Sequence, residues 1–255
     1  MNAPSLTFAQ ASTADELAAH APAWDALAEA HARHGGLCTT YPWFASFAEH
    51  RASALGSSWA CLFAYEGDVL VGVLPFVRRA HTLLRRARPW LHVPGDEHTT
   101  GGGLLVDMQD AARAQLLARA LVEHALKRSP RPVGLRFGGL VPEAIARTAL
   151  SGMSGALVTE EDLAGRSVPL DGTWADFHAG LGSNLRRNLR KARNRLGKTG
   201  ALEVETTEDP ADLDRYLALE SSGWKGADGG DVANRPDALA FYRAFVARLA
   251  ERGSL

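Results

Sequence analysis

The sequence is poor in cysteine and contains no long apolar run, and both absences narrow the class of protein that it encodes. Its 255 residues include only Cys38 and Cys61, which are too few for a disulfide framework and have no metal-ligand spacing around them. No apolar stretch approaches the roughly 20 residues of a membrane-spanning helix, and the N-terminus lacks the basic and apolar regions of a signal peptide. We therefore expect a soluble, cytoplasmic protein without membrane insertion.

The sequence also lacks an excess of charge of either sign. It has 28 Lys and Arg against 29 Asp and Glu, which gives a formal net charge of −1. Binding of a nucleic acid or an anionic surface must then depend on a local cluster of charge. The chain has no hydrolase nucleophile elbow, Walker loop, dinucleotide fingerprint or zinc spacing. The enzyme classes that depend on those motifs are therefore disfavoured.

One segment is strongly basic. Residues 182–198 carry seven positive charges, inside a window (177–202) that contains no acid. A helix is predicted there, because four apolar residues fall on one narrow stripe with the basic residues filling most of the opposite arc. Those four residues are Leu185, Leu189, Ala192 and Leu196.

Positive charge at the start of this helix is unfavourable for helix stability. Arg186 and Arg187 occupy the predicted first turn, where the helix dipole is itself positive. We therefore predict a substrate-binding role for Asn184, Arg186, Arg187 and Arg190, with CoA phosphates, a nucleotide-sugar, an anionic polymer or tRNA as the anion. The alternative is a solvated helix face. Sequence-specific reading of nucleic acid is disfavoured, because no aromatic residues are interleaved with the charges.

The pattern of the first 172 residues predicts an α/β unit with a mixed sheet. A hairpin is the clearest signal, with apolar runs at 59–65 and 69–78 joined by a short turn. Pro75 inside the second run predicts an edge or bulged strand. The other expected strands are 6–10, 89–93, 103–106, 133–137, 157–158 and 167–170, and the expected helices are 13–28, 42–50, 111–127 and 142–150.

The later part of the chain repeats the order in which the first part begins. After the basic helix we expect a strand at 202–206, a helix from 209 to about 223, a loop at 226–236 and a helix at 237–252. A single strand cannot form a sheet of its own. The order therefore predicts an internal duplication, with a first unit at 1–172 and a truncated second unit at 173–255.

Several segments resemble a known family. They are S-N-L-R-R-N-L-R-K-A-R-N-R-L (183–196), A-L-E-S-S-G-W-K-G (218–226) and F-Y-R-A-F-V-A-R-L-A-E-R-G-S-L (241–255), with Y-P-W-F (41–44) and G-V-L-P-F-V (72–77) upstream. Together they look like the CelD-type acyltransferases of the GNAT superfamily. These are similar to the FemAB proteins, which carry two GNAT-like units in tandem.

The resemblance implies an N-acyltransferase that uses acetyl-CoA or another acyl-CoA, with no metal. Its acceptor would be a small-molecule or saccharide amine, in polysaccharide or cell-envelope biosynthesis. Superfamily members hold the CoA pyrophosphate where a strand turns into a helix N-terminus. In this chain the second unit ends before that turn. The matching turn of the first unit, at 106–112, has two acids and no glycine, which makes it a poor phosphate cradle. The cofactor-binding residues therefore stay unassigned.

Two other readings of the function remain open. One is FemAB-like aminoacyl transfer from a charged tRNA, which would give the basic helix a partner. The other is a non-catalytic anion-binding fragment that lacks the cofactor segment.

Three further residues are candidates for the site. Trp224 and Lys225 either line the acceptor cleft on a loop, or Trp224 packs as a lid over the preceding helix. The glycine-rich residues 228–231 beside them suggest a mobile flap. His98, on a polar loop with carboxylates nearby, is the best acid/base candidate, against the alternative of an ordinary surface histidine.

Overall fold

A computed structural model of the protein describes most of the chain and divides it into two compact units. The described residues are 5–31, 36–53, 58–83, 86–95, 103–128, 130–140, 144–151, 153–154, 171–201 and 203–254. We call Met1–Val158 with Asp209–Leu255 the sheet unit, and Thr159–Glu208 the basic-helix unit.

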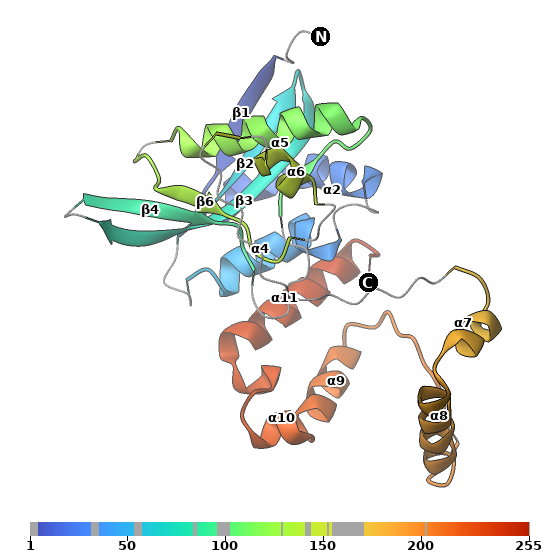
Figure 1. Cartoon of the computed structure of the whole chain (residues 1–255). Coiled ribbons are helices and arrows are strands. Elements are labelled where there is room, and N and C mark those ends of the chain that lie inside the picture. The colour runs from blue at the N-terminus through green and yellow to red at the C-terminus, as the bar shows by residue number, and fades with distance from the viewer. Residues whose placement is uncertain are drawn as a thin grey trace. The chain divides into compact units, whose positions relative to one another are not determined.

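The sheet unit is built on a six-stranded sheet (Figure 1). The strand order is β1-β2-β3-β4-β6, and β5 pairs with β3. All described pairs are antiparallel except β4 with β6, which is parallel, so the sheet is mixed. This confirms the predicted α/β fold class. The strands are β1 (Leu6–Ala11), β2 (Ser58–Glu66), β3 (Val69–Leu83), β4 (Arg86–His92), β5 (Leu105–Val106) and β6 (Gly134–Arg136).

The predicted hairpin forms the centre of the sheet. Gly67, with φ of 60°, and Asp68 form the two-residue turn between β2 and β3, a conformation that glycine adopts without strain. Alternate residues of the two strands enter opposite cores: Phe63 packs on one face, and Leu62 on the other. Because both faces are covered, these strands are continuous apolar runs rather than alternating ones.

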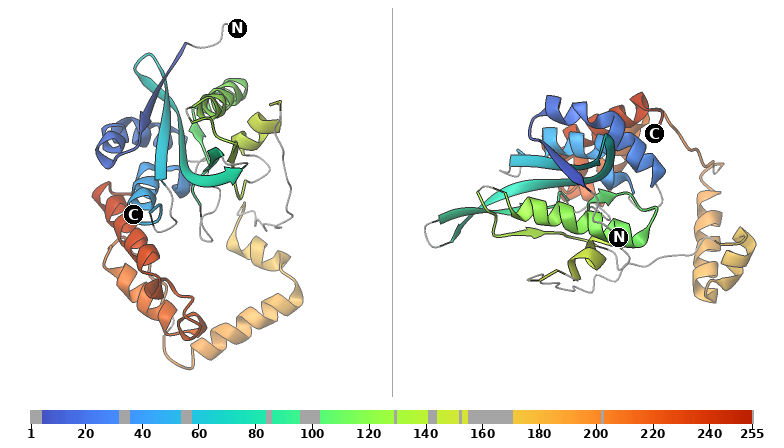
Figure 2. Two further views of the ribbon diagram at one scale, coloured as in Figure 1. Left: turned by 90° about the vertical axis from the view of Figure 1, so that its left-hand side faces the viewer. Right: turned by 90° about the horizontal axis from the view of Figure 1, so that it is seen from above.

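Helices α1, α2 and α4 cover one face of the sheet, and α5 and α6 cover the other (Figure 2). Thr13 caps α1 through a capping box with Glu16. Asp110 caps α5 by accepting from the Arg113 N–H. The bounds are α1 (Ala14–Ala19), α2 (Ala21–Ala30), α4 (Tyr41–His50), α5 (Ala111–Leu126) and α6 (Ile145–Ser151), with a short 3₁₀ helix η1 (Leu37–Thr39) before α4.

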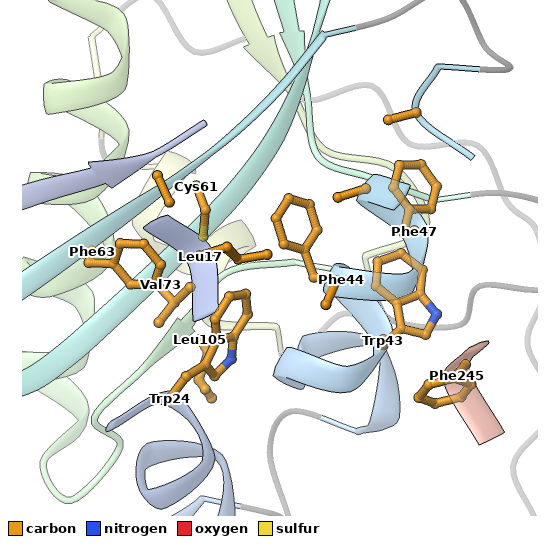
Figure 3. Close-up of a cluster of buried hydrophobic side chains, with 14 of the residues drawn as sticks. Leu17, Trp24, Trp43, Phe44, Phe47, Cys61, Phe63, Val73, Leu105 and Phe245 are labelled. Carbon is orange, nitrogen blue, oxygen red and sulfur yellow. The ribbon is translucent and has the colours of Figure 1, made fainter. Parts of the chain in front are cut away.

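Aromatic side chains fill the core on the α4 face (Figure 3). Trp24, Phe44 and Phe63 are almost completely buried. The Trp24 indole N–H donates to the carbonyl of Thr39 at 2.8 Å, which satisfies the one polar atom of that ring. On the opposite face, α5 lies so close to β3 that a Cβ on Gly72 would stand 2.8 Å from a methyl carbon of Leu121.

The last helix, α11 (Pro236–Glu251), packs on α4 and so belongs to the sheet unit. Phe241 and Phe245 of α11 enter the same core as Trp43. Ion pairs fasten its two ends: Arg51–Asp237 (2.6 Å), Arg248–Glu49 (2.6 Å) and Arg252–Asp25 (2.9 Å). The compact units therefore do not follow the expected boundary at 172/173, because the apolar face of α11 is buried against the first half. A duplication across that boundary stays a prediction.

The strand expected at 202–206 does not form. Glu203–Glu208 has no regular secondary structure, and Val204 is 92% exposed. A strand needs a neighbouring strand to satisfy its backbone groups, and none pairs with this stretch in the described chain. The expected extended pieces at 157–158 and 167–170 lie outside the described residues.

Pro75 lies at a local edge of β3, as the proline predicted, although β3 is central in the strand order. It pairs with Cys61 of β2 on one side. On the other side, the described pairings skip the residues around it: β5 pairs with Gly72 and Val73, and β4 begins its pairing at Val77. The missing proline N–H fits this gap between two partner strands, since no ladder bond is required there.

The remaining helices lie in the later part of the chain. The basic-helix unit contains α7 (Trp174–Gly180), which the sequence pattern did not predict and which Thr173 caps, and α8 (Ser183–Leu196). The sheet unit adds α9 (Asp212–Ser221), α10 (Trp224–Ala227) and the 3₁₀ helix η2 (Val232–Asn234). No helix among the described residues is both long and apolar enough to span a membrane.

Candidate functional site

The basic helix α8 forms as the sequence predicts, and it begins without side-chain help. Gly182 at the N-cap provides no side-chain hydrogen bond, and the first turn contains no acid. Serine, threonine or an acid at these positions would satisfy free N–H groups and favour the dipole. The local sequence therefore leaves the positive end of this helix open.

The cations of α8 have no carboxylate partner among the described residues. The Arg186 guanidinium donates to the carbonyl of Ala179 at 2.7 Å, and Arg187 donates to the Asn184 side-chain oxygen at 3.0 Å. Arg190 has no ion pair in the described chain. Asn184 and Arg186 thus help to shape the first turns, while the positive charges themselves are not neutralised.

The apolar stripe of α8 is also uncovered. Leu185, Leu189 and Leu196 are 49%, 42% and 51% exposed, and no residue of the helix is buried. The sequence pattern correctly predicted the stripe. A stripe of this kind normally packs on a core. Its exposure indicates that α8 offers its apolar side chains for an interaction and does not use them to support the fold.

Trp224 and Lys225 lie on α10, which packs closely against the end of α9. Lys225 forms an ion pair with Glu220 at 2.7 Å, and Glu220 also accepts from the Val232 N–H at 3.1 Å. The hydrogen bond to Lys225 lowers the pKa of Glu220, and the same contact raises the pKa of Lys225, so both stay charged. A Cβ on Gly226 would stand 1.8 Å from the Ser221 carbonyl oxygen, so only glycine fits there.

Trp224 does not pack as a lid over α9: it is 74% exposed. The Lys225–Glu220 ion pair and the close approach of Gly226 to Ser221 fix the turn, and the exposure of the Trp224 ring follows from this local fold. Lys225 differs, because its ammonium group is committed to Glu220. Of the two predicted residues, only Trp224 presents its side chain freely to a ligand.

The predicted mobile flap is anchored by a residue that the sequence reasoning missed. Asp231 is completely buried; it accepts from the Ser221 hydroxyl and from the Asn234 amide at 2.5 Å. The Ser221 hydrogen bond lowers the pKa of Asp231, which favours a buried carboxylate that stays charged. The sequence signal was the Asp-x-x-Asn spacing ahead of the helix at 236, which is typical of a capped turn rather than a flap.

The strand-to-helix turn between β5 and α5 is filled by the protein's own carboxylate. Asp107, at 9% exposure, accepts from the Gln109 N–H at 3.0 Å and pairs with Arg113 and, at 3.2 Å, with His31. Burial raises the pKa of Asp107, but these donors outweigh it and hold the pKa below its ordinary value. An anionic side chain thus occupies the position where a phosphate would need free N–H donors. The prediction of a poor phosphate cradle agrees with this geometry.

The predicted site residues are distributed over both compact units. Asn184, Arg186, Arg187 and Arg190 share α8 in the basic-helix unit, whereas Trp224 and Lys225 belong to the sheet unit. His98 lies outside the described residues. Among those described, no three His, Cys, Asp or Glu side chains gather in a way that could hold a metal ion.

Comparison with known proteins finds a family model that is similar to the later part of the chain. Residues 183–255 match the family model described as an acetyltransferase (GNAT) domain. The matched segment covers α8, α9, α10 and α11 and so crosses from the basic-helix unit into the sheet unit. The match supports acyl transfer in general, and the CelD-type or FemAB-like affiliation remains a prediction.

Other comparisons add little to this assignment. No curated protein matches the chain. A solved structure titled "Crystal structure of a probable acetyltransferase" is similar at 19% sequence identity, with a TM-score of 0.38. The similarity covers 66% of this chain and 99% of that chain.

Proposed function

We propose that the protein is an N-acyltransferase that moves an acyl group from acyl-CoA to the amine of an acceptor. The observation that carries this proposal is the match of residues 183–255 to the GNAT acetyltransferase domain. That segment contains both the basic helix and the packed turn of α9 and α10 on which Trp224 is exposed. Each candidate substrate-binding residue therefore lies inside the part of the chain that resembles known acetyltransferases.

The proposed reaction is direct transfer. The acceptor amine attacks the thioester carbonyl, a C–N bond forms, the C–S bond breaks, and the thiolate of CoA takes up the proton that the amine loses. Backbone N–H groups would stabilise the developing oxyanion. The acceptor proposed is a small molecule or saccharide, in polysaccharide or cell-envelope biosynthesis.

In this proposal α8 binds the anionic part of a substrate. Three observations support it: the helix start is uncapped, its cations lack carboxylate partners in the described chain, and Arg186 and Arg187 oppose the dipole. Arg190 lies one turn further along the helix and extends the same charge. Trp224 would contact the acceptor, while Lys225 holds the α10 turn through Glu220.

A second candidate is a non-catalytic anion-binding protein. The β5–α5 turn favours it, because Asp107 and its donors occupy that turn and leave no phosphate cradle there. Aminoacyl transfer from tRNA is the remaining alternative and would use the same basic helix.

Calorimetric titration of acetyl-CoA, combined with a chromatographic assay of CoA release, tests the proposal. Chromatography is preferred to a thiol reagent because Cys38 is partly exposed and would react with such a reagent. We expect saturable acetyl-CoA binding and CoA release that depends on an added amine. Arg186→Glu with Arg187→Glu should weaken binding of the anionic substrate at least about tenfold, as expected for loss of two charged contacts. Binding without turnover over a panel of amines would favour the non-catalytic alternative, and no binding at all would refute the acyltransferase.

A further inference from the structure

A second basic surface lies in the sheet unit and is made of residues not assigned above. Residues 69–95 carry five arginines and no acid, and residues 124–140 carry four Arg and Lys and no acid. The first range spans β3 and β4, and the second spans the end of α5 and β6. The ribbon formed by β3 and β4 reaches out past the helices in two views (Figures 1 and 2).

The strand register puts the key side chains on one face. Arg79 is paired with Trp90, and Trp90 with Gly134. One step along, Val77 is paired with His92, and His92 with Arg136. Residues paired across strands, and residues two apart along a strand, share a face. Arg79, Trp90, His92 and Arg136 therefore form one surface, which we call the sheet-edge patch.

The Trp90 ring lies over Gly134 of the edge strand. A Cβ on Gly134 would stand 2.7 Å from the Cζ3 atom of the ring, so the indole occupies the space that a side chain would take. Trp90 is partly exposed, and its one described aromatic contact is with His92, at 6.4 Å between centroids. A partly exposed indole supported by a strand is suited to stacking against another planar ring.

The charges around this ring repel one another. Burial lowers the pKa of His92, and the positive charges of Arg79 and Arg136 lower it further. Arg79 and Arg136 are exposed, and neither has a carboxylate partner in the described chain. Arg88 of β4 donates to the carbonyls of Arg131 and Pro132, at 3.0 and 2.7 Å, and so adds charge while fastening β4 to the approach of β6.

The opposite face of the same strands repeats the pattern. Arg78 and Arg128 each lie 5.9 Å from the centroid of Phe76. Burial and the charge of Arg78 lower the pKa of Arg128. Like charges that converge without a counter-ion are destabilising in the free protein, and an anionic ligand would relieve the repulsion.

We propose that the sheet-edge patch is a nucleotide-binding site, with a base stacked on Trp90 and its phosphate held by Arg79 and Arg136. The ligand is either a free nucleotide or one unit of a single-stranded RNA, since both present a planar base next to a phosphate. Stacking on an aromatic side chain beside arginines is the usual way in which proteins bind such groups without reading sequence. The site is separate from the proposed acyl-transfer residues and does not depend on them.

The test uses the full chain and two probes: a fluorescein-labelled uridine RNA of about 12 nucleotides, within the usual site size, and unlabelled UDP as a competitor. Arg79→Glu with Arg136→Glu should weaken RNA binding at least about tenfold and flatten its salt dependence. Trp90→Leu should weaken it about fivefold or more, and Trp90→Phe less, because phenylalanine still stacks. Arg215→Glu with Arg243→Glu is the matched control: it reverses two exposed arginines outside both proposed sites, changes the net charge equally and should alter affinity by less than about twofold.

The outcomes separate the two sources and can overturn the site. Competition by UDP would indicate a free nucleotide, and binding of RNA alone would indicate a strand. Equal loss in both charge-reversal variants, no effect of Trp90→Leu in a folded variant, or equal competition by inorganic pyrophosphate would overturn the assignment, as would failure of both probes to bind. Acetyl-CoA binding should be unchanged in the patch variants. Its loss there would make the patch part of the acyl-donor site and refute a separate nucleotide site.

Discussion

The two halves of the described chain differ in how completely they bury their apolar side chains. Between residues 5 and 154, three large apolar residues are prominently exposed: Leu37, Val69 and Leu116. Between 171 and 224 there are eight: Trp174, Leu185, Leu189, Leu196, Val204, Tyr216, Leu219 and Trp224. The first half, which we call the closed half, buries its apolar side chains on both faces of one sheet. The second half, which we call the open half, adds α11 to that core and buries a small cluster around Leu217 and Val232, but these eight large side chains stay exposed.

This difference indicates where binding is to be expected. Scattered exposed apolar residues are ordinary, but a concentration of them beside unpaired cations is characteristic of an interaction surface. The match to the GNAT domain falls over the same region. The closed half also contains the Asp107 network, which fills the strand-to-helix turn between β5 and α5. Ligand binding at the proposed acyl-transfer site is therefore expected from the open half.

The largest expected effect is a matched pair of leucine substitutions. Leu121→Ala on α5 removes a completely buried side chain and should destabilise the sheet unit by about 2–5 kcal/mol. Leu189→Ala on α8, where the side chain is 42% exposed, should cost less than about 0.5 kcal/mol. Urea unfolding followed by far-ultraviolet circular dichroism measures both. Similar losses of unfolding free energy in the two variants would show that the apolar stripe of α8 is packed in solution, and would contradict the difference between the two halves.

A smaller effect on stability is expected at the closely packed turn between α9 and α10 in the open half. Gly226→Ala places a methyl group against the Ser221 backbone and should destabilise the protein by about 1–3 kcal/mol through overpacking. Gly180→Ala, where a Cβ meets nothing within 4 Å, is the control, and it should leave stability nearly unchanged. Thermal unfolding distinguishes the two. An unaffected Gly226 variant would mean that α10 is not fixed against α9, and the exposure of Trp224 would then need another explanation.

The sequence predicted the closed half well, because its signals are local. The capping box at Thr13, the Gly67 turn and the stripe of α5 each specify an element without reference to the rest of the fold. Pro75 correctly indicated a local edge, but the gap between β4 and β5 that creates this edge is a long-range feature. The strand expected at 202–206 did not form, because β structure depends on a partner that no local pattern reveals.

The candidate site was only partly predictable. The charges of α8 are visible in the sequence because they are contiguous and free of acids. The commitment of Lys225 to Glu220, the burial of Asp231 and the juxtaposition of Arg79 with Arg136 arise from packing between separate elements. The alternative in which Trp224 packs as a lid assumed that the indole would cover the preceding helix. Instead, Gly226 lies so close to the Ser221 backbone that the turn keeps Trp224 exposed.

Asp107 offers a pH test of the closed half. Its folded-state pKa is held below the ordinary 3.8, so the carboxylate contributes stability that is complete above the unfolded pKa and is lost as pH falls through the folded value. Asp107→Asn should cost about 1–3 kcal/mol at neutral pH, because a buried charge-assisted network is broken. The gap between wild type and variant should narrow as pH falls below about 4. A gap that stays constant from pH 7 to 3 would show that the ion pairs contribute nothing to the closed turn.

The smallest effect on stability is expected at the start of α8, and its sign separates function from structure. Arg186→Glu with Arg187→Glu replaces two cations with acids at the positive end of the helix, which should stabilise α8 by about 0.3–1 kcal/mol. The same variant should lose anionic-substrate binding. Arg193→Glu with Arg195→Glu, in the last turn, changes the net charge equally but should weaken the helix, because acids there oppose the dipole. Helicity by circular dichroism and acetyl-CoA titration on both variants give the answer. If the first variant gains helicity and keeps its binding, the two arginines are a solvated face, and the acyl-transfer proposal loses its anion site.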